Sequence, residues 1–172
     1  MQTALARGWR YLQRQQRDDG AWLPLWFGNQ YADNEVNATY GTARVLKACA
    51  ALGQTHSPAA ERAARWLCAS QQSDGGWGGD PASPPSLEET ALAVEALLPY
   101  SEHAPAIRRG LTWLIEHLDP VDDLPAAPIG LYFARLWYYE KLYPYIFCDF
   151  SITPLQGTRC ARDTECELPV FF

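Results

Sequence analysis

Apolar residues recur at three- and four-residue spacing in separate stretches of the chain, and each such stretch predicts an amphipathic helix. The predicted helices span residues 3–16, 39–52, 58–71, 87–98 and 105–118. Loops rich in Gly and Asp separate them, and Ser86 with Glu89 forms a capping-box pair at the start of the fourth. A sixth apolar segment, 129–143, is dense in aromatic residues and ends before Pro144, so we expect a sixth helix there. The pattern predicts an all-α fold.

One pattern occurs twice along the chain. Its positions are a basic residue, a small residue, an aromatic–Leu pair, Gln, Gly and Trp: Arg7, Gly8, Tyr11, Leu12, Gln16, Gly20 and Trp22, then Arg62, Ala63, Trp66, Leu67, Gln71, Gly75 and Trp77. A third copy starts at Arg109 and keeps its helix but loses the Gln, Gly and Trp. A repeat of this length is one helical hairpin, which buries its apolar face only against a neighbouring hairpin. The repeat therefore predicts that the chain forms about three stacked helical hairpins.

The repeated Gln, Gly and Trp suit a structural role. A Gln at the end of a helix can hydrogen-bond main-chain groups of the adjoining turn and of a neighbouring helix. The Gly permits a left-handed turn, and the Trp can cover the end of the preceding helix and stack on the Gln amide. Losing the amide would cost on the order of 1–3 kcal/mol if a buried partner is left unsatisfied. We interpret these as scaffold residues: Gln16, Gly20, Trp22, Gln71, Gly75 and Trp77.

The loop after the first repeat differs from the loop after the second. The segment from Trp22 to Thr42 is longer than the equivalent segment from Trp77 to Thr90, and its extra residues include aromatic side chains. Long loops at a shared rim often carry function. We expect the first loop to border a functional site.

The repeat resembles the QW motif of the squalene-hopene and oxidosqualene cyclases, and both copies fit it at every defined position. The segment Tyr40-Gly41-Thr42 and the segment from Tyr139 to Pro144 are also similar to cyclase segments, the second to the last inner helix. The likeness covers about residues 4–147 and corresponds to the C-terminal portion of such enzymes. It implies an α/α toroid, here a partial ring formed by residues 1–147. Residues 148–172 lack periodicity and are interpreted as an irregular, poorly ordered tail.

The resemblance also implies chemistry. Cyclases of this superfamily, which act in terpenoid and hopanoid biosynthesis, fold a long isoprenoid such as squalene in an apolar cavity and cyclise it through carbocations. Aromatic faces stabilise these cations by about 0.5–2 kcal/mol each. The residues that the resemblance places in the cavity are Trp26, Tyr40, Tyr132 and Tyr139, whereas Leu136 replaces a family aromatic. No cofactor is implied.

The acid of the family is an Asp in an Asp-x-Asp-Asp motif, which lies upstream of the part that this chain resembles. The run from Asp119 to Asp123 has the wrong spacing and is interpreted as a solvated loop. We therefore assign no catalytic residue and expect the chain alone to be inactive. Its expected partners are an isoprenoid ligand and either an N-terminal toroid half or a second copy of the chain.

Two other functions compete with this interpretation. The first is a non-catalytic half toroid that binds an isoprenoid or another protein chain, because exposed inner helices would present an apolar face. The second is a protein related to prenyltransferase β subunits, suggested by the Gly-rich run 75–79. Those enzymes hold zinc with Asp, Cys and His, but the three histidines, His56, His103 and His117, have no matching partners in the sequence. A measurement of zinc content discriminates the two families.

Composition narrows these alternatives further. Hydrophobic residues make up 48% and aromatic residues 13% of the chain, which indicates a large core, a cavity wall or both. The net charge is −6 and basic residues do not cluster, so nucleic acid is not an expected partner. No apolar run reaches membrane-spanning length and no signal-peptide pattern precedes the first helix, so we expect a cytoplasmic or peripheral membrane protein.

Overall fold

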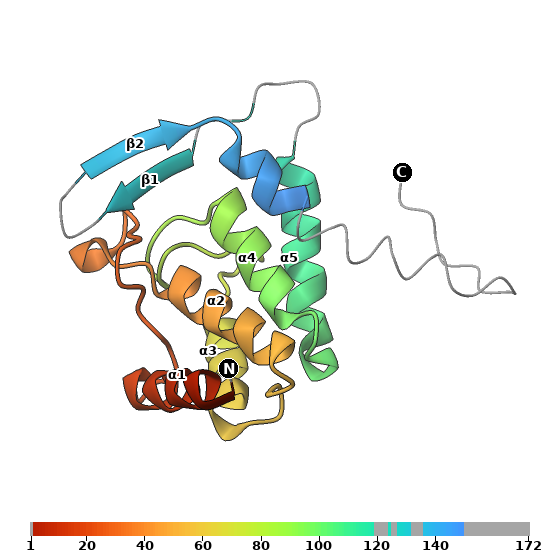
Figure 1. The fold of residues 1–172 in the computed structure, drawn as a ribbon. Coiled ribbons are helices and arrows are strands. Elements are labelled where there is room, and N and C mark those ends of the chain that lie inside the picture. The colour runs from red at the N-terminus through yellow and green to blue at the C-terminus, as the bar shows by residue number, and fades with distance from the viewer. Residues whose placement is uncertain (1, 119–123, 125–126, 132–135, 150–172) are drawn as a thin grey trace, which may run out of the picture.

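The computed structural model describes residues 2–118, 124, 127–131 and 136–149 (Figure 1). The helices are α1 (Gln2–Gln15), α2 (Ala38–Ala51), α3 (Pro58–Ser70), α4 (Leu87–Leu97) and α5 (Ala104–His117). Two short 3-10 turns, η1 (Asp33–Glu35) and η2 (Ser101–His103), precede α2 and α5. Residues 143–149 are also helical. Each of the first five predicted helices is present and begins one residue or less from its expected start.

Side-chain caps define where three of these helices begin. The Asn37 side chain accepts a hydrogen bond from the Tyr40 amide at 2.8 Å, which caps α2. Ser57 accepts from the Ala60 amide at 3.3 Å at the start of α3, and Ser86 accepts from the Glu89 amide at 3.1 Å at the start of α4. Such caps satisfy amide groups that have no partner within the helix. The capping role predicted for Ser86 is confirmed.

The helices pair into hairpins around one core. The inner helix α2 packs against α3 and against the next inner helix, α4, which in turn packs against α5 (Figure 1). Large side chains at this meeting point are fully buried, among them Leu46, Leu67, Leu97 and Leu114. The all-α class and the arrangement of paired helices in a partial α/α ring are confirmed. Within the described residues, no helix is both long and apolar enough to cross a membrane.

The repeated Gln residues join each outer helix to the next one. Gln16 Nε2 donates to the Gly20 carbonyl at 2.9 Å and to the Ala59 carbonyl in α3 at 2.8 Å. Gln71 Nε2 donates in the same way to Gly75 at 2.8 Å and to Ala106 in α5 at 2.9 Å. The hydrogen bonds predicted for the two Gln residues are thus present. They connect α1 to α3 and α3 to α5 in series.

Glycine is required at the turn that follows each Gln. Gly75 has a φ of 101°, and a Cβ atom there would lie 2.8 Å from the carbonyl oxygen of Arg109. Gly8, inside α1, has no atom within 4 Å of an added Cβ. We expect Gly75→Ala to lower the free energy of unfolding by about 1–3 kcal/mol, because the positive φ strains an alanine backbone and the added methyl group would also clash with the Arg109 carbonyl. Gly8→Ala should raise the free energy of unfolding by up to about 1 kcal/mol, because Ala has a higher helix propensity than Gly.

Urea unfolding followed by circular dichroism measures both of these changes. The two substitutions add the same methyl group, so their opposite signs test the turn geometry directly. Equal effects of the two would contradict the assigned role of Gly75.

The helix predicted over 129–143 is wrong. This region contains an antiparallel pair, β1 (Ala127–Leu131) and β2 (Leu136–Glu140), with Ile129 opposite Tyr138 and Gly130 opposite Trp137. Consecutive aromatic residues favour a strand, and Gly disfavours a helix. Pro144 lies in the first turn of helix 143–149 instead of ending a helix, which suits its fixed φ and missing N–H.

Helix 143–149 also extends into the segment that was predicted to be an irregular tail. Cys148 is 3% exposed and belongs to the core cluster. The boundary predicted between residues 147 and 148 therefore falls within a helical segment, and the remainder of the predicted tail, 150–172, lies outside the described residues.

Candidate functional site

The long first loop is folded back on itself before α2 begins. Gly28 and Val36 form an antiparallel bridge, and the Asn29 amide donates to the Glu35 carbonyl at 3.1 Å. The loop also packs against the loop of the second repeat, because a Cβ on Gly79 would lie 2.4 Å from the Cβ of Asn29. The aromatic residues of this loop are therefore carried on a braced structure next to the inner helices.

Glu89 is the polar centre that holds this loop to α4. Its Oε1 accepts hydrogen bonds from the side-chain amides of Asn29 at 3.1 Å and Asn37 at 2.7 Å. The other oxygen, Oε2, accepts from the hydroxyl of Ser86. Glu89 is 8% exposed, so these donors replace the water that a carboxylate would otherwise need. Glu89, predicted from the sequence as the capping-box partner of Ser86, thus also joins the first loop and the start of α2 to α4.

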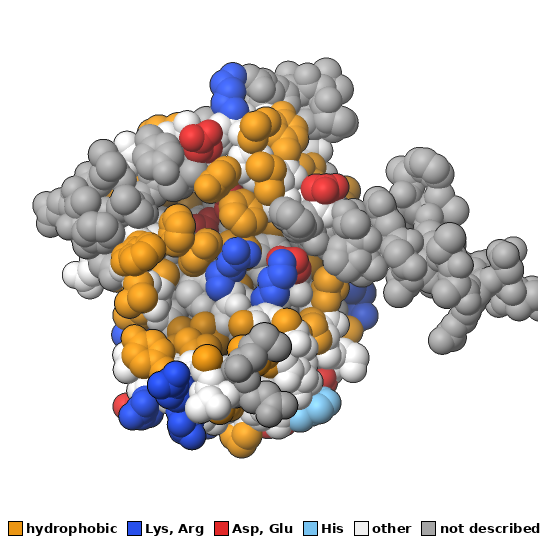
Figure 2. Space-filling model, viewed as in Figure 1, with side chains coloured by type: hydrophobic (Ala, Val, Ile, Leu, Met, Phe, Trp, Pro, Cys, Tyr) orange, Lys and Arg blue, Asp and Glu red, His pale blue; other side chains and the backbone are white. Residues whose placement is uncertain are grey.

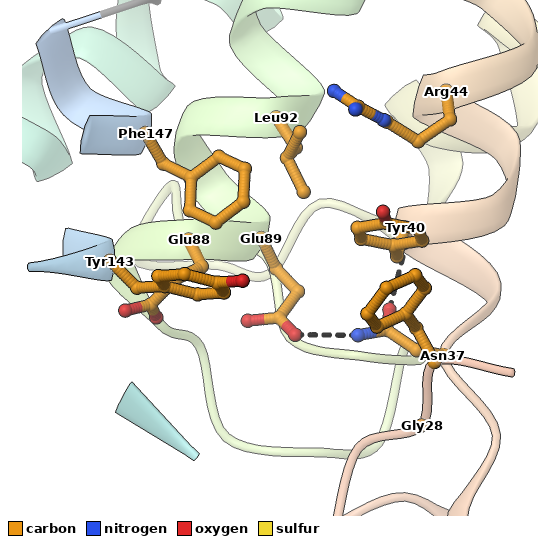
Figure 3. A pocket seen from close by; sticks show the side chains of 10 residues that line it. Gly28, Asn37, Tyr40, Arg44, Glu88, Glu89, Leu92, Tyr143 and Phe147 are labelled. Atoms are coloured by element: carbon orange, nitrogen blue, oxygen red, sulfur yellow. Dashed lines mark hydrogen bonds between the residues drawn. The ribbon is translucent and has the colours of Figure 1, made fainter. Parts of the chain in front are cut away.

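A cavity of about 180 Å³ lies above this centre (Figure 3). Its aromatic side chains form two pairs, one from the first loop and α2 and the other from helix 143–149. Phe27 and Tyr40 have ring centroids 4.9 Å apart, and Tyr143 and Phe147 have centroids 5.4 Å apart. Figure 3 shows Tyr40 on one side of the cavity and Tyr143 with Phe147 on the other, with the start of α4 between them. Four aromatic rings therefore surround one small space.

Charged groups line the same cavity. The guanidinium carbon of Arg44 lies 5.7 Å from the centroid of the Tyr40 ring, and both residues belong to α2. Glu88 lies next to Glu89 in the lining. Burial, together with the negative charge of Glu89, raises the pKa of Glu88 to about 7. The Glu88 carboxyl can therefore bind or release a proton near neutral pH.

The candidate residues from the sequence are distributed over several places. Tyr40 lines the cavity. Trp26 is 61% exposed. Tyr139 is 59% exposed, and its hydroxyl lies 3.3 Å from Gln30 Nε2, which donates to it. Tyr132 lies outside the described residues, as does the acidic run 119–123.

Of the residues that line the cavity, Tyr40 alone was a site candidate from the sequence, and the side chains that were missed include Glu88, Tyr143 and Phe147. The sequence signal for Glu88 was available, since two adjacent carboxylates open an inner helix and only one of them is needed as a cap. Tyr143 and Phe147 were obscured by the helix predicted over 129–143. Among the described residues, no three His, Cys, Asp or Glu side chains are placed together to hold a metal ion.

Known proteins resemble the chain over most of its length. The family "Squalene-hopene cyclase C-terminal domain" matches residues 1–123. Enfumafungin synthase of Hormonema carpetanum is 33% identical over 152 residues, which cover 80% of this chain and 10% of that protein. A squalene–hopene cyclase of Bradyrhizobium diazoefficiens is 35% identical over 124 residues, covering 64% of this chain and 18% of the cyclase. Drimenyl diphosphate synthase of Streptomyces showdoensis is 36% identical over 124 residues, covering 69% and 22%.

A solved structure has the same fold. The ent-copalyl diphosphate synthase from Streptomyces platensis superposes with a TM-score of 0.61 at 24% identity, covering 86% of this chain and 27% of that one. The chain thus spans less than a third of the length of each of these proteins. Its repeats, its paired helices and the match over residues 1–123 agree, and the chain belongs to the squalene-hopene cyclase C-terminal domain family.

Proposed function

We propose that this chain supplies the scaffold and one aromatic wall of the cavity in which a terpene cyclase cyclises a long isoprenoid through carbocations. The observation that carries the proposal is the pair of aromatic clusters, Phe27 with Tyr40 and Tyr143 with Phe147, on two sides of one cavity. Ring faces attract a cation, and they do so without forming a bond that would trap it. Such a lining suits a hydrocarbon that becomes positively charged during its reaction.

The size of the cavity supports its being one part of a larger site. Pockets that enclose a drug-sized ligand measure about 300–1,000 Å³, whereas this cavity measures about 180 Å³. It can hold a segment of a long isoprenoid but not the whole molecule. The remaining walls come, in this proposal, from further cyclase sequence.

An apolar rim continues beyond the cavity. We define the rim patch as Leu25, Trp26, Tyr31 and Tyr139, all of which are exposed. The contact between Gln30 and Tyr139 ties the first loop to β2, so the patch spans both elements. Figure 2 shows apolar side chains gathered on this face of the molecule. Exposed apolar surface of this kind marks a binding face, and we assign it to the N-terminal toroid half or to the bound isoprenoid.

The acid that starts the reaction is assigned to the missing part of the cyclase. Protonating an alkene needs a far stronger acid than a carboxyl with a pKa of about 7, which is the value for Glu88. The chain alone is therefore expected to bind an isoprenoid weakly and to turn none over. The relatives include a squalene–hopene cyclase and a drimenyl diphosphate synthase, so the proposal covers long isoprenoids with or without a diphosphate.

The test begins with the DNA that precedes the Met1 codon. The longest reading frame that contains this chain is expressed, and its extracts are assayed for cyclic products from squalene and geranylgeranyl diphosphate by mass spectrometry. We expect cyclic products from a longer protein and none from the 172-residue chain. A frame without further cyclase repeats, together with no isoprenoid binding by the chain, would refute the proposal.

A matched pair of variants tests the aromatic wall in the active protein. Tyr40→Ala removes a cavity ring and should lower the rate of cyclisation about tenfold, since each cation–ring contact contributes about 0.5–2 kcal/mol. Ile115→Ala removes an exposed side chain of the outer helix α5 and should leave the rate unchanged. Equal rates in the two variants would show that the Tyr40 ring does not contact the reacting chain.

A further inference from the structure

Two adjacent glutamates open α4, and their surroundings differ. The Glu89 carboxylate already accepts hydrogen bonds from Asn29, Asn37 and Ser86, so it serves the scaffold. Glu88 shares the Ser86 side chain as a hydrogen-bond partner but does not contact the two amides, and it lines the same cavity as Glu89. Burying an ionised carboxyl beside aromatic rings costs free energy unless its negative charge stabilises another group, such as a bound cation.

The groups around Glu88 define what its cavity can accept. The titratable and charged groups that face it are Glu89 on α4, Tyr40 and Arg44 on α2, and Tyr143 and Cys148 on helix 143–149. Among the described residues of the lining, Arg44 is the one cation and lies at the Tyr40 ring, whereas Glu88 and Glu89 both bring negative charge. Negative charge among four ring faces suits an organic cation.

We infer that Glu88 is the base that accepts the proton lost by the carbocation at the end of cyclisation. This inference rests on the proposed function and adds a catalytic residue to it. A C–H bond next to the cationic carbon breaks, and its electron pair forms the π bond of an alkene. The proton forms an O–H bond with a Glu88 carboxylate oxygen, so the substrate charge falls from +1 to 0 and the carboxylate becomes a neutral acid.

The environment of Glu88 also allows the base to be regenerated. Glu88 is only partly buried, so its proton can pass to solvent water. Burial holds its pKa at about 7, at which both the protonated and the ionised form are populated at neutral pH. Glu88 can therefore take a proton from a carbocation and release it to solvent before the next turnover.

Binding of a stable cation tests the site on the 172-residue chain itself. The probe is decyltrimethylammonium below its micelle concentration, measured by calorimetry, with 1-decanol as the uncharged probe. Affinity for the cation should rise about tenfold from pH 6 to pH 8, because the ionised fraction of a carboxyl with a pKa near 7 rises by that factor. The rise should be lost in Glu88→Gln and kept in Glu116→Gln, which changes an exposed carboxyl on α5. Binding of 1-decanol should not depend on pH.

The products of the active cyclase test the base. Glu88→Gln should reduce the share of alkene products at least tenfold and raise the share of alcohols, because water then captures the cation. An unchanged product ratio in an active Glu88→Gln variant would overturn the inference, as would cation binding that is independent of pH. An inactive wild-type protein would instead refute the proposed function, so the two failures are distinguishable.

Discussion

Replacing Trp77 with alanine is expected to lower the free energy of unfolding by about 3–5 kcal/mol. The Trp77 side chain is fully buried, and its ring lies against Gly110 so closely that a Cβ there would be 2.6 Å from it. Its indole N–H donates to the Leu67 carbonyl at 2.8 Å, and its backbone amide donates to the Thr90 hydroxyl at 2.9 Å. The substitution would leave a cavity at the point where α3, α4 and α5 meet, and among the described side chains the Leu67 carbonyl would keep only the Ser70 hydroxyl as a donor.

Two further variants separate burial from hydrogen bonding. Trp77→Phe keeps most of the ring but loses the indole N–H, so a smaller loss of about 1–3 kcal/mol is expected. Trp26→Ala removes an equally large side chain that is 61% exposed, and its effect should stay within about 0.5 kcal/mol. Urea unfolding monitored by circular dichroism gives all three values. A loss for Trp26→Ala as large as that for Trp77→Ala would contradict the assignment of Trp77 to the central core.

Replacing Glu88 with glutamine is expected to stabilise the protein at high pH and not at low pH. The pKa of Glu88 is about 7 in the folded protein, above the ordinary value of 4.5, so the folded state holds this proton more tightly than the unfolded state. The wild type therefore loses stability as the pH rises from about 4.5 to about 7, and no more above it. Relative to the wild type, Glu88→Gln should gain up to about 3 kcal/mol between pH 4 and pH 8. Unfolding in urea at several pH values measures this gain.

The neighbouring residue provides the control. Glu89→Gln replaces one acceptor oxygen with an NH₂ group that cannot accept from Asn29, Asn37 or Ser86. This variant should be less stable than the wild type at neutral pH by about 1–3 kcal/mol, because a buried donor loses its partner. If both variants stabilise the protein at pH 8, or if the Glu88→Gln difference does not change with pH, the separate roles of the two glutamates are wrong.

Local signals were sufficient for the scaffold. The three- and four-residue apolar spacing, the capping residue Ser86 and the turn residue Gly75 act within a few positions of the chain, so each could be recognised without tertiary contacts. The repeat added long-range information, because two copies of one hairpin pack in one way. This is why the hydrogen bonds of Gln16 and Gln71 to the next outer helix could be anticipated.

Only the tertiary structure decided what happens after α5. An apolar, aromatic segment can form either a helix or a strand, and in the described part of 127–140 pairing between β1 and β2 takes the place of the predicted helix. That pairing and the helix at 143–149 bring Tyr143 and Phe147 to the cavity, where the sequence had placed other aromatics.

The roles of Glu88 and Glu89 also separate what the sequence determined from what the tertiary structure decided. The amino-acid sequence by itself determined that the chain is a stack of helical hairpins and that it resembles the cyclases, since both follow from a short motif and its repetition along the chain. It identified Glu89 as the capping partner of Ser86 but could not show the surroundings of either carboxyl, because these are set by distant groups. The amides of Asn29 and Asn37 donate to Glu89, whereas Glu88 is partly buried beside aromatic rings. Proton affinity depends on solvent access and on charges brought together by folding, and only the tertiary structure sets these.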